Sequence, residues 1–405
     1  MTKDLSEMRV AVVHDWMFTR RGGERVLERI LNLFPQADLF VLFGEPERCL
    51  ITKSQHKIVR SFLAKLPRIE KYYKYLLPLL PLATESHDLS NYDLVLSSSS
   101  CAAKGVICHP HATHVSYIHS PMRYAWDMEL SYFPPPDPKR SKWKNLLLGP
   151  VEFLRRILLS KLRIWDVSSS ARVDVFCANS LFVKRRIELY YRRFANIVHP
   201  PVDIEIFRTA RTQRTPLQRT VLLFGAWVPY KRMDWALQGL RSALPQDVHI
   251  IAAGHGELFE PTRRAFAQVP GVEFIESPSG HVIEEMYQRS HVLAFPGIED
   301  FGIIPVEAMS AGVWVVGPNR GGTNETILDG VTGFLFDADA GPDQMMAALI
   351  SGVNTALTRE FPAKDDQVEK HLERFSGSHF DSKLLQIIAK AVSENAITAN
   401  AAGNT

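Results

Sequence analysis

The hydrophobic and polar positions of this chain form two kinds of segment, short apolar runs and longer stretches with helical spacing. The apolar runs show little polar alternation, which is typical of strands buried on both faces of a parallel sheet. Because helical stretches separate them, the runs favour doubly wound α/β domains. The predicted strands cover residues 9–14, 38–43, 93–97, 114–117, 173–178, 220–224, 248–253, 273–277, 292–295 and 313–316.

The clearest helices follow glycines or prolines. Residues 24–33 carry apolar side chains at helical spacing directly after Gly22 and Gly23. A second helix is expected from about Ile304 to Gly312, since Pro305 suits a first turn and glycine suits the position after a helix end. A last helix is expected over residues 376–392.

Length and composition indicate a two-domain globular protein. The 405 residues are 46% hydrophobic and 22% charged, which is ordinary for a globular chain and exceeds one domain of common size. The polar stretch 208–219 reads as a structureless linker between the domains. The last ten residues carry no charge and are expected to be disordered.

Several classes of protein are disfavoured by simple counts. The net charge of +3 gives no support to nucleic-acid binding. The four cysteines form no C-x-x-C pair and have no histidines at zinc spacing, so we expect neither a metal site nor a redox pair. No signal peptide and no apolar run of about 20 residues is present, which predicts a cytoplasmic location.

Basic charge is concentrated in two stretches of the first half, residues 56–82 and 139–163. From Leu154 onward, apolar positions recur at helical spacing while Arg155 and Arg163 fall elsewhere around the helix. This pattern predicts a helix drawn to an anionic membrane surface, at the inner face of the cell membrane. An ordinary amphipathic helix packed on its own domain is the alternative.

The segment 291–325 holds the most informative chemistry. Glu299 lies in the loop after the strand 292–295, and Glu307 lies on the helix that follows. The free N–H groups of a helix start bind anions at the carboxyl edge of a parallel sheet, and carboxylates accept hydrogen bonds from hydroxyls. A ligand that is part phosphate and part polyol, such as a nucleotide sugar, suits this combination. Two surface acids at an ordinary junction are the alternative.

These residues carry a family resemblance. Glu299 and Glu307 form an E-x(7)-E pattern that encloses Phe301-Gly302 and precedes Gly321-Gly322 and Glu325. The pattern resembles the donor-binding signature of the retaining glycosyltransferases of family 4, and the resemblance runs from His14 to about Phe380. It implies the GT-B fold, in which two Rossmann-like domains face a central cleft. The implied parts are an acceptor and membrane domain (1–207), a donor domain (220–380), a helix crossing back (381–395) and a tail (396–405).

In the first half, the resemblance assigns the loop after the first strand to donor phosphate and acceptor. We carry this assignment to Asp15, Gly22 and Gly23, although a tight glycine turn alone would explain the pair. His119 directly follows a predicted strand, and the resemblance gives it contact with the donor sugar and a catalytic role; a hydrogen-bonding cap of the strand is the alternative. Arg123 is expected either to pair with an acceptor phosphate or to form a structural ion pair.

In the second half, the resemblance assigns Lys231 to the donor diphosphate. There a compact cation offsets the negative charge that grows on the leaving nucleotide as the glycosidic bond breaks. The family usually adds an arginine where this chain has Ala226, so Arg232 is the remaining candidate beside it. The backbone of Phe301, Gly302 and Ile303 would bind the sugar and phosphates. Glu299 would bind the hexose and act with His119 and Lys231 in catalysis, while Glu307 would bind the ribose. No metal or other cofactor is expected, since no D-x-D pattern lies at a strand end where a metal-dependent transferase would place one.

The resulting prediction is transfer of a hexose, with retention, from a nucleotide sugar to a lipid-linked acceptor. Similarity to the bacterial mannosyltransferase-like branch, which builds O-antigen or exopolysaccharide, favours GDP-mannose as the donor. Other readings are a family 4 enzyme that uses a UDP-sugar, and a nucleotide-sugar-binding protein without turnover. A nucleic-acid-binding protein is a third, disfavoured because the basic stretches are rich in apolar and aromatic residues.

Overall fold

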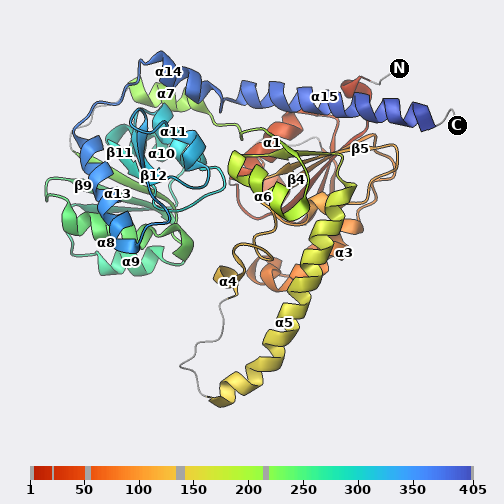
Figure 1. Ribbon diagram of the computed structural model, residues 1–405, viewed down its shortest axis with the longest axis horizontal. Helices are drawn as coiled ribbons and strands as arrows, with labels where there is room; N and C mark the ends of the chain where they lie inside the picture. The colour runs from red at the N-terminus through yellow and green to blue at the C-terminus, as the bar shows by residue number, and fades with distance from the viewer. Residues whose placement is uncertain (1–3, 21, 51–55, 134–141, 213–218, 403–405) are drawn as a thin grey trace. The chain divides into compact units, whose positions relative to one another are not determined.

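The computed structural model describes residues 4–20, 22–50, 56–133, 142–212 and 219–402 (Figure 1). The chain divides into two compact units. The N-terminal unit is formed by Met1–Val198 with Asp381–Thr405, and the C-terminal unit by His199–Phe380. Each unit holds one parallel sheet, and this confirms the predicted α/β class with two Rossmann-like parts.

The N-terminal unit is built on a seven-stranded sheet in the order β3-β2-β1-β4-β5-β6-β7. All its pairings are parallel, and the strands next to the centre are buried almost throughout, as expected when helices cover both faces. The strands are β1 (Val10–Met17), β2 (Asp38–Gly44), β3 (Ile58–Arg60), β4 (Leu94–Ser99), β5 (Thr113–Ile118), β6 (Val175–Ala178) and β7 (Ala195–Ile197).

Helices and 3-10 turns connect these strands. The last helix, α15, joins the chain back to this unit: the Arg29 guanidinium donates to Asp381 at 2.8 Å, and Leu384 and Ile388 are buried. The α-helices are α1 (Gly22–Leu33), α2 (Pro46–Cys49), α3 (Leu80–Glu85), α4 (Glu129–Tyr132), α5 (Lys142–Ser169), α6 (Leu181–Tyr191) and α15 (Gly377–Ala402). The 3-10 turns are η1 (Leu5–Glu7), η2 (Phe62–Lys65), η3 (Ile69–Lys71), η4 (Tyr73–Leu79), η5 (Ala103–Gly105) and η6 (Ser170–Arg172).

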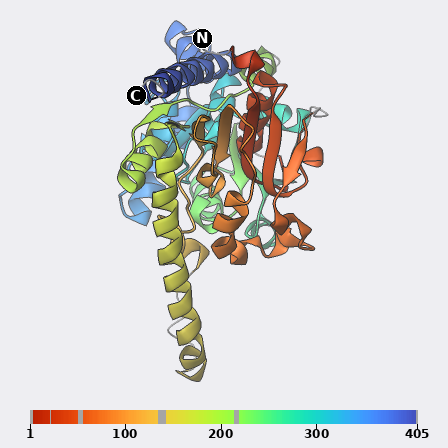
Figure 2. The same cartoon turned by 90° about the vertical axis from the view of Figure 1, so that its right-hand side faces the viewer.

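Helix α5 is divided into a packed half and a projecting half. Its C-terminal half buries Leu159 and Leu162 and anchors in this unit through the fully buried Asp166. Its N-terminal half extends away from the rest of the unit in both views (Figures 1 and 2), and there Phe153 and Leu154 are 67% and 55% exposed. Residues 139–141 of the basic stretch lie outside the described residues.

The C-terminal unit is built on a six-stranded parallel sheet in the order β10-β9-β8-β11-β12-β13. Its strands are β8 (Thr220–Ala226), β9 (His249–His255), β10 (Val272–Glu276), β11 (Val292–Ala294), β12 (Trp314–Pro318) and β13 (Gly333–Phe336). Its helices are α7 (Ile204–Thr212), η7 (Pro229–Lys231), α8 (Met233–Ala243), α9 (Phe259–Ala265), α10 (His281–Arg289), α11 (Ile303–Ser310), α12 (Thr323–Thr326), α13 (Pro342–Leu357) and α14 (Asp366–Glu373).

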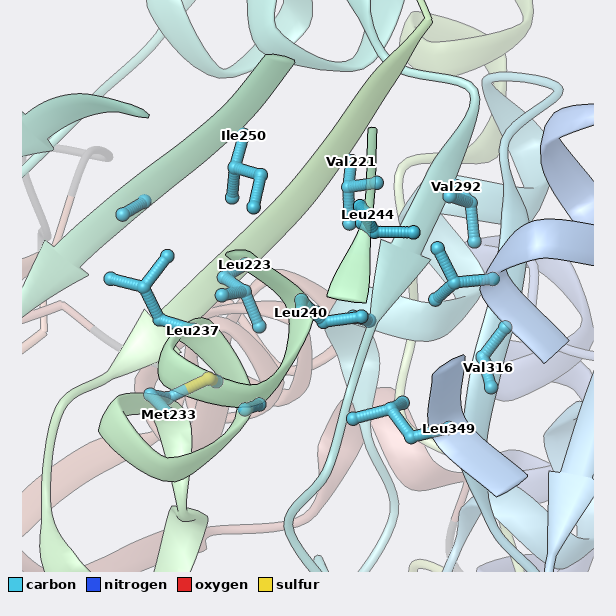
Figure 3. Close-up of a cluster of buried hydrophobic side chains, with 14 of the residues drawn as sticks. Val221, Leu223, Met233, Leu237, Leu240, Leu244, Ile250, Val292, Val316 and Leu349 are labelled. Atoms are coloured by element: carbon cyan, nitrogen blue, oxygen red, sulfur yellow. The ribbon is translucent and has the colours of Figure 1, made fainter. Parts of the chain in front are cut away.

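An apolar layer on one face of this sheet holds α8 and α13 in place (Figure 3). Side chains from β8, β9, β11 and β12 meet the apolar stripes of the two helices. The helical spacing of the apolar residues therefore directs one side of each helix into the core. The labelled members are Val221, Leu223, Met233, Leu237, Leu240, Leu244, Ile250, Val292, Val316 and Leu349.

Several local predictions were wrong. Helix α1 begins at Gly22, so the glycine pair forms its first turn rather than a separate loop. The stretch 208–219 is helical up to Thr212, because α7 buries Ile204, Phe207 and Ala210 in the C-terminal unit. Residues 213–218 lie outside the described residues.

The end of the chain also differs from the prediction. Helix α15 continues to Ala402 rather than ending before the uncharged tail. Four alanines among residues 396–402 favour propagation of a helix that is already formed. Residues 403–405 lie outside the described residues. Within the described ranges, no helix has the length and apolar character needed to cross a membrane.

Candidate active site

In the C-terminal unit, a cation and a carboxylate meet at the carboxyl edge of the sheet. Lys231 ends η7, in the loop after β8, and Glu299 lies in the loop after β11. Because β8 and β11 are neighbours, their loops meet, and the Lys231 ammonium forms an ion pair with Glu299. The two side chains are 11% and 22% exposed, so the pair is mostly enclosed yet reachable from solvent.

Glycines make this meeting of loops possible. A Cβ atom on Gly297 would lie 2.9 Å from the Cα of Lys231, closer than real Cβ contacts allow. A Cβ on Gly322 would lie 1.9 Å from the carbonyl oxygen of Phe301. The Gly322 N–H donates to the Glu299 carbonyl at 2.8 Å. This hydrogen bond holds the backbone of the residue that carries the carboxylate.

Helix α11 begins at Ile303, four residues after Glu299. Gly302 occupies the position before its first residue with a φ of +82°, a conformation that glycine adopts without a steric penalty. The first N–H groups of a helix lack partners within it, so those from Ile303 onward suit an anion. Phe301 is buried against Phe375, with ring centroids 5.6 Å apart. Its backbone is therefore held while its side chain fills the core.

Glu307 lies deeper than Glu299. The residue is 3% exposed on α11, and its carboxylate accepts a hydrogen bond from the Tyr287 hydroxyl of α10 at 3.1 Å. The alternative of two ordinary surface acids does not describe these positions, because neither side chain is freely solvated.

His199 lies beside Phe301, although no sequence pattern pointed to it. Its Nε2 lies 3.2 Å from a carboxylate oxygen of Glu325, and its ring centroid lies 5.7 Å from that of Phe301. Glu325 follows Gly321-Gly322 in the motif described above, so the sequence did point to this partner of His199. His199 stands 126 positions away and has no local pattern of its own.

Arg232 lies apart from the ion pair. Its backbone is left-handed, with a φ of 54°, and its guanidinium lies 3.4 Å from the sulfur of Met345 on α13. The neighbouring Lys231 is directed to Glu299 instead. Ala226 ends β8 and has only a methyl side chain. Among the described contacts of the loop after β8, the cation that pairs with Glu299 is Lys231.

In the N-terminal unit, Asp15 is fully engaged by backbone. One carboxylate oxygen accepts from the N–H groups of Ser100 and Cys101 at 2.6 and 2.8 Å. The other accepts from Ala102 and Ala103 at 2.6 and 2.8 Å. With 2% exposure, the residue holds the turn after β4 in place. The predicted contact with an acceptor stays a prediction.

His119 directly follows β5, as predicted, and is half-buried. Its Nε2 lies 2.8 Å from the hydroxyl of Ser98 on β4, and that hydroxyl lies 3.1 Å from Nδ1 of His14 on β1. Gly23 in the first turn of α1 faces the ring, because a Cβ built on it would lie 3.8 Å from Nε2. The structure therefore groups Gly23 and His119, and it adds His14 and Ser98.

The loop after His119 is tied to helix α5. The Arg123 guanidinium donates to the Ser120 hydroxyl at 3.1 Å, and the Trp126 indole donates to Asp166 at 2.7 Å. Asp166 also pairs with Lys104 at 2.9 Å, and both side chains are at most 1% exposed. Asp166 therefore connects the C-terminal half of α5 to η5 through Lys104 and to the segment that carries Arg123 through Trp126.

In the part of the chain that the structure describes, no cluster of three or more His, Cys, Asp or Glu residues could hold a metal ion. Burial raises the pKa of Cys108 and of Cys177 to about 12, so these thiols stay protonated near neutral pH.

Comparison with known proteins identifies the second half most clearly. Residues 218–354 match the family described as glycosyl transferases group 1. The D-inositol 3-phosphate glycosyltransferase of Mycolicibacterium paratuberculosis is 28% identical over 221 residues, which are 49% of this chain and 48% of the relative. The alpha-1,3/1,6-mannosyltransferase alg-2 of Neurospora crassa is 32% identical over 294 residues, 60% and 62% of the two chains. The chain spans about half the length of the first curated relatives it matches.

Solved structures extend the likeness over the whole fold. The structure of HepE from Anabaena in complex with UDP and glucose superposes with a TM-score of 0.66 at 15% identity, covering 95% of this chain and 100% of that one. The lipopolysaccharide outer core galactosyltransferase WaaB, in its apo form, gives a TM-score of 0.60 at 16% identity, covering 95% and 99%.

The two parallel sheets and this likeness define the class of fold as GT-B. Within that class, residues 218–354 match the group 1 glycosyltransferases. The family predicted from the E-x(7)-E pattern is confirmed for this segment, which contains the pattern.

Proposed function

We propose that this protein transfers a hexose, with retention of anomeric configuration, from a nucleotide diphosphate sugar to a lipid-linked acceptor at a membrane surface. The observation that carries the proposal is the pair of Lys231 and Glu299 beside the start of α11. A cation, helix N–H groups and a carboxylate at one sheet edge match the diphosphate and the hydroxyls of such a donor.

The chemistry follows from how these groups differ. As the glycosidic bond breaks, negative charge grows on the leaving diphosphate, and Lys231 and the N–H groups from Ile303 onward stabilise it. Glu299 accepts hydrogen bonds from the hexose, Glu307 binds the ribose, and His119 steadies the sugar. The acceptor hydroxyl then attacks the oxocarbenium-like centre from the face that the diphosphate leaves.

GDP-mannose is the donor we favour. The named relatives include the alg-2 mannosyltransferase and the phosphatidyl-myo-inositol mannosyltransferase of Mycobacterium tuberculosis, which is 30% identical over 166 residues, 39% of this chain and 44% of the relative. A UDP-sugar is the second candidate, because the matching HepE structure contains UDP and glucose. Both donors share the diphosphate that Lys231 would bind.

The membrane part of the proposal rests on the projecting half of α5. Apolar side chains lie exposed beside basic ones: Phe153 is 67% and Leu154 55% exposed, and Arg156 is largely exposed in the next turn. This projecting half of α5, called the arm below, has a composition that favours the interface of an anionic bilayer, where its apolar side chains are removed from water. A lipid-linked acceptor would be met there.

Release of nucleoside diphosphate tests the transferase. GDP-mannose, UDP-glucose and UDP-N-acetylglucosamine are each incubated with the protein, with and without an extract of lipid-linked precursors. We expect release from one donor that depends on the extract and falls about 100-fold or more in Glu299→Gln. The control Glu360→Gln removes an exposed carboxylate of the same unit and leaves the rate unchanged. Donor binding without release under any condition would instead indicate a binding protein, consistent with Ala226.

Co-sedimentation with vesicles tests the arm. Vesicles with anionic lipid should retain the native chain and lose the double variant Phe153→Ser, Ile157→Ser, while neutral vesicles bind both weakly. Ile206→Ser, at an exposed position of α7 in the other unit, is the matched control. Equal binding of all three proteins to anionic vesicles would remove α5 from the proposal, and salt-sensitive binding to DNA or RNA alone would favour the nucleic-acid alternative.

A further inference from the structure

Three polar side chains of the N-terminal unit form one hydrogen-bonded chain across three adjacent strands. His14 and Ser98 are register partners on β1 and β4, so their side chains stand on the same face of the sheet. Ser98 is in turn the partner of Tyr117 on β5, and His119 is two positions further along. The period of two along a strand therefore brings His119 to the same face, where it meets the Ser98 hydroxyl.

The inner part of this chain is withdrawn from water. Ser98 is fully buried and His14 is 4% exposed, whereas His119 is half-buried at the outer end. A serine hydroxyl carries a single proton, so Ser98 can donate to only one of the two rings and must accept from the other if both contacts are hydrogen bonds. The tautomers of His14 and His119 are thereby linked through one atom.

We propose that His14 and Ser98 are positioning residues that fix the ring orientation and the tautomer of His119. The inference rests on the proposed function, in which His119 steadies the transferred hexose. Of the two ring nitrogens, Nε2 is directed at Ser98, 2.8 Å away. The ring then keeps one orientation toward the Gly23 turn, where Cε1 and Nε2 lie 3.8 Å and Nδ1 lies 4.0 Å from an added Cβ. Loss of the Ser98 contact removes the hydrogen bond that fixes the protonation of Nε2.

The opposite face of the same strand offers a matched control. Ser97 and the buried His114 make a contact of the same length, 2.8 Å, and Ser97 also donates to Ser116. Because neighbouring residues of a strand point to opposite faces, this pair lies away from His119. Ser97→Ala removes at least as much buried hydrogen bonding from β4 as Ser98→Ala, and it should leave His119 untouched.

Steady-state kinetics on the donor that the native chain turns over give the first measurement. We expect kcat to fall about 10-fold to 100-fold in Ser98→Ala and in His14→Leu, with KM for the donor changed less than about 3-fold. His14→Asn, whose amide stands near the position of Nδ1, should recover most of that loss. Ser97→Ala should keep the native kcat.

A spectroscopic measurement separates this inference from the proposed function, because it needs no substrate. In the protein labelled with ¹⁵N-histidine, the ring nitrogens of His119, assigned by its substitution, report one fixed tautomer. In Ser98→Ala and His14→Leu the two shifts should move toward the averaged values of a ring in tautomeric exchange, and in Ser97→Ala they should not.

The outcomes are distinct. Native ¹⁵N shifts of His119 in Ser98→Ala would overturn the inference, whatever the enzyme assay gives. Altered shifts together with a native kcat would also overturn it, since the ring would then need no fixed position. If the native chain releases no nucleoside diphosphate while the shifts respond as expected, the hydrogen-bonded chain exists and the proposed function is the part that fails.

Discussion

The carboxyl edges of the two sheets hold their polar groups in different ways. At the edge of the C-terminal unit, backbone approaches backbone: Gly297, Gly321 and Gly322 leave no room for a Cβ, and the loops so packed carry Lys231 and Glu299. At the edge of the N-terminal unit, side chains hold the backbone and one another, as Asp15 and the chain from His14 to His119 show.

This difference explains which edge the sequence reveals. The glycines and carboxylates of the C-terminal edge fall within the short segment 297–325 and form a pattern that can be read along the chain. The contacts of the N-terminal edge join residues that are far apart in sequence: Asp15 and its partners are separated by 85 to 88 positions. The family match covers residues 218–354, which lie in the second unit.

The largest effect on stability is expected for Asp15→Ala. The change leaves four backbone N–H groups of the turn after β4 without their acceptor, and we expect the free energy of unfolding to fall by about 4 kcal/mol or more. Urea unfolding measures this fall. Asp4→Ala, which removes an exposed cap, is the control with little change. Native stability combined with lost transfer would instead assign Asp15 to the acceptor and break the comparison.

Gly322→Ala should follow, with a loss of about 3 kcal/mol, because the added methyl group meets the Phe301 carbonyl and the loop that carries Glu299 must move. Gly341→Ala, at a position with open space and a negative φ, is the matched control. Urea unfolding and binding of a nucleoside diphosphate are measured together. A stable variant that binds the nucleoside diphosphate like the native chain would show that Gly322 is replaceable. Close backbone packing would then not be what holds the loops of the C-terminal edge.

Acid should weaken the N-terminal unit through His114, on the face of the sheet opposite to His119. Burial lowers the pKa of His114 to about 4, from an ordinary value near 6.5. Between these values the unfolded chain binds a proton that the folded chain does not, so stability is fully present above about pH 6.5 and falls as the pH drops toward 4. At pH 5 the loss from this residue is about 2 kcal/mol.

The check is urea unfolding of the native chain and of His114→Gln at pH 7.5 and pH 5.0. The variant should lose less stability between the two pH values than the native chain does. The exposed His109 supplies the control His109→Gln, which should keep the native pH dependence. Equal losses in all three proteins would show that His114 is not the group responsible.

The smallest effect on stability is expected for Lys231→Met, about 1 kcal/mol or less. Methionine keeps the apolar stem, and an ion pair that solvent can reach contributes little to folding. Thermal unfolding measures the change, and donor binding should be lost in the same variant. A loss of about 3 kcal/mol or more would mark the pair as a structural one. The contrast with Asp15→Ala separates a charged side chain that stabilises its sheet edge from one that serves a ligand.

The sequence predicted the inner strands of both sheets and the edge strand β10, and it missed the other three edge strands. Strands β1, β2, β4, β5 and β6 of the first sheet were predicted from their apolar runs, whereas β3 and β7 at its edges and β13 at the edge of the second were not. An edge strand pairs on one side only and needs no continuous apolar run, as the three-residue strand Ile58–Arg60 shows. Helix α7 was missed for a related reason, because its short apolar stripe acquires meaning only against α10 and α11.

By itself, the sequence determined the α/β class, the family, the inner strands, and the placement of Glu299 and Glu307 on either side of a helix start. These features depend on local spacing, since apolar periodicity and glycine positions act over a few residues. Only the tertiary structure decided that Lys231 pairs with Glu299 and that the Asp15 carboxylate accepts hydrogen bonds from four backbone N–H groups. It also decided that Ser98 connects His14 to His119. Those contacts exist because parallel strands bring distant positions into register, and no local pattern carries that register.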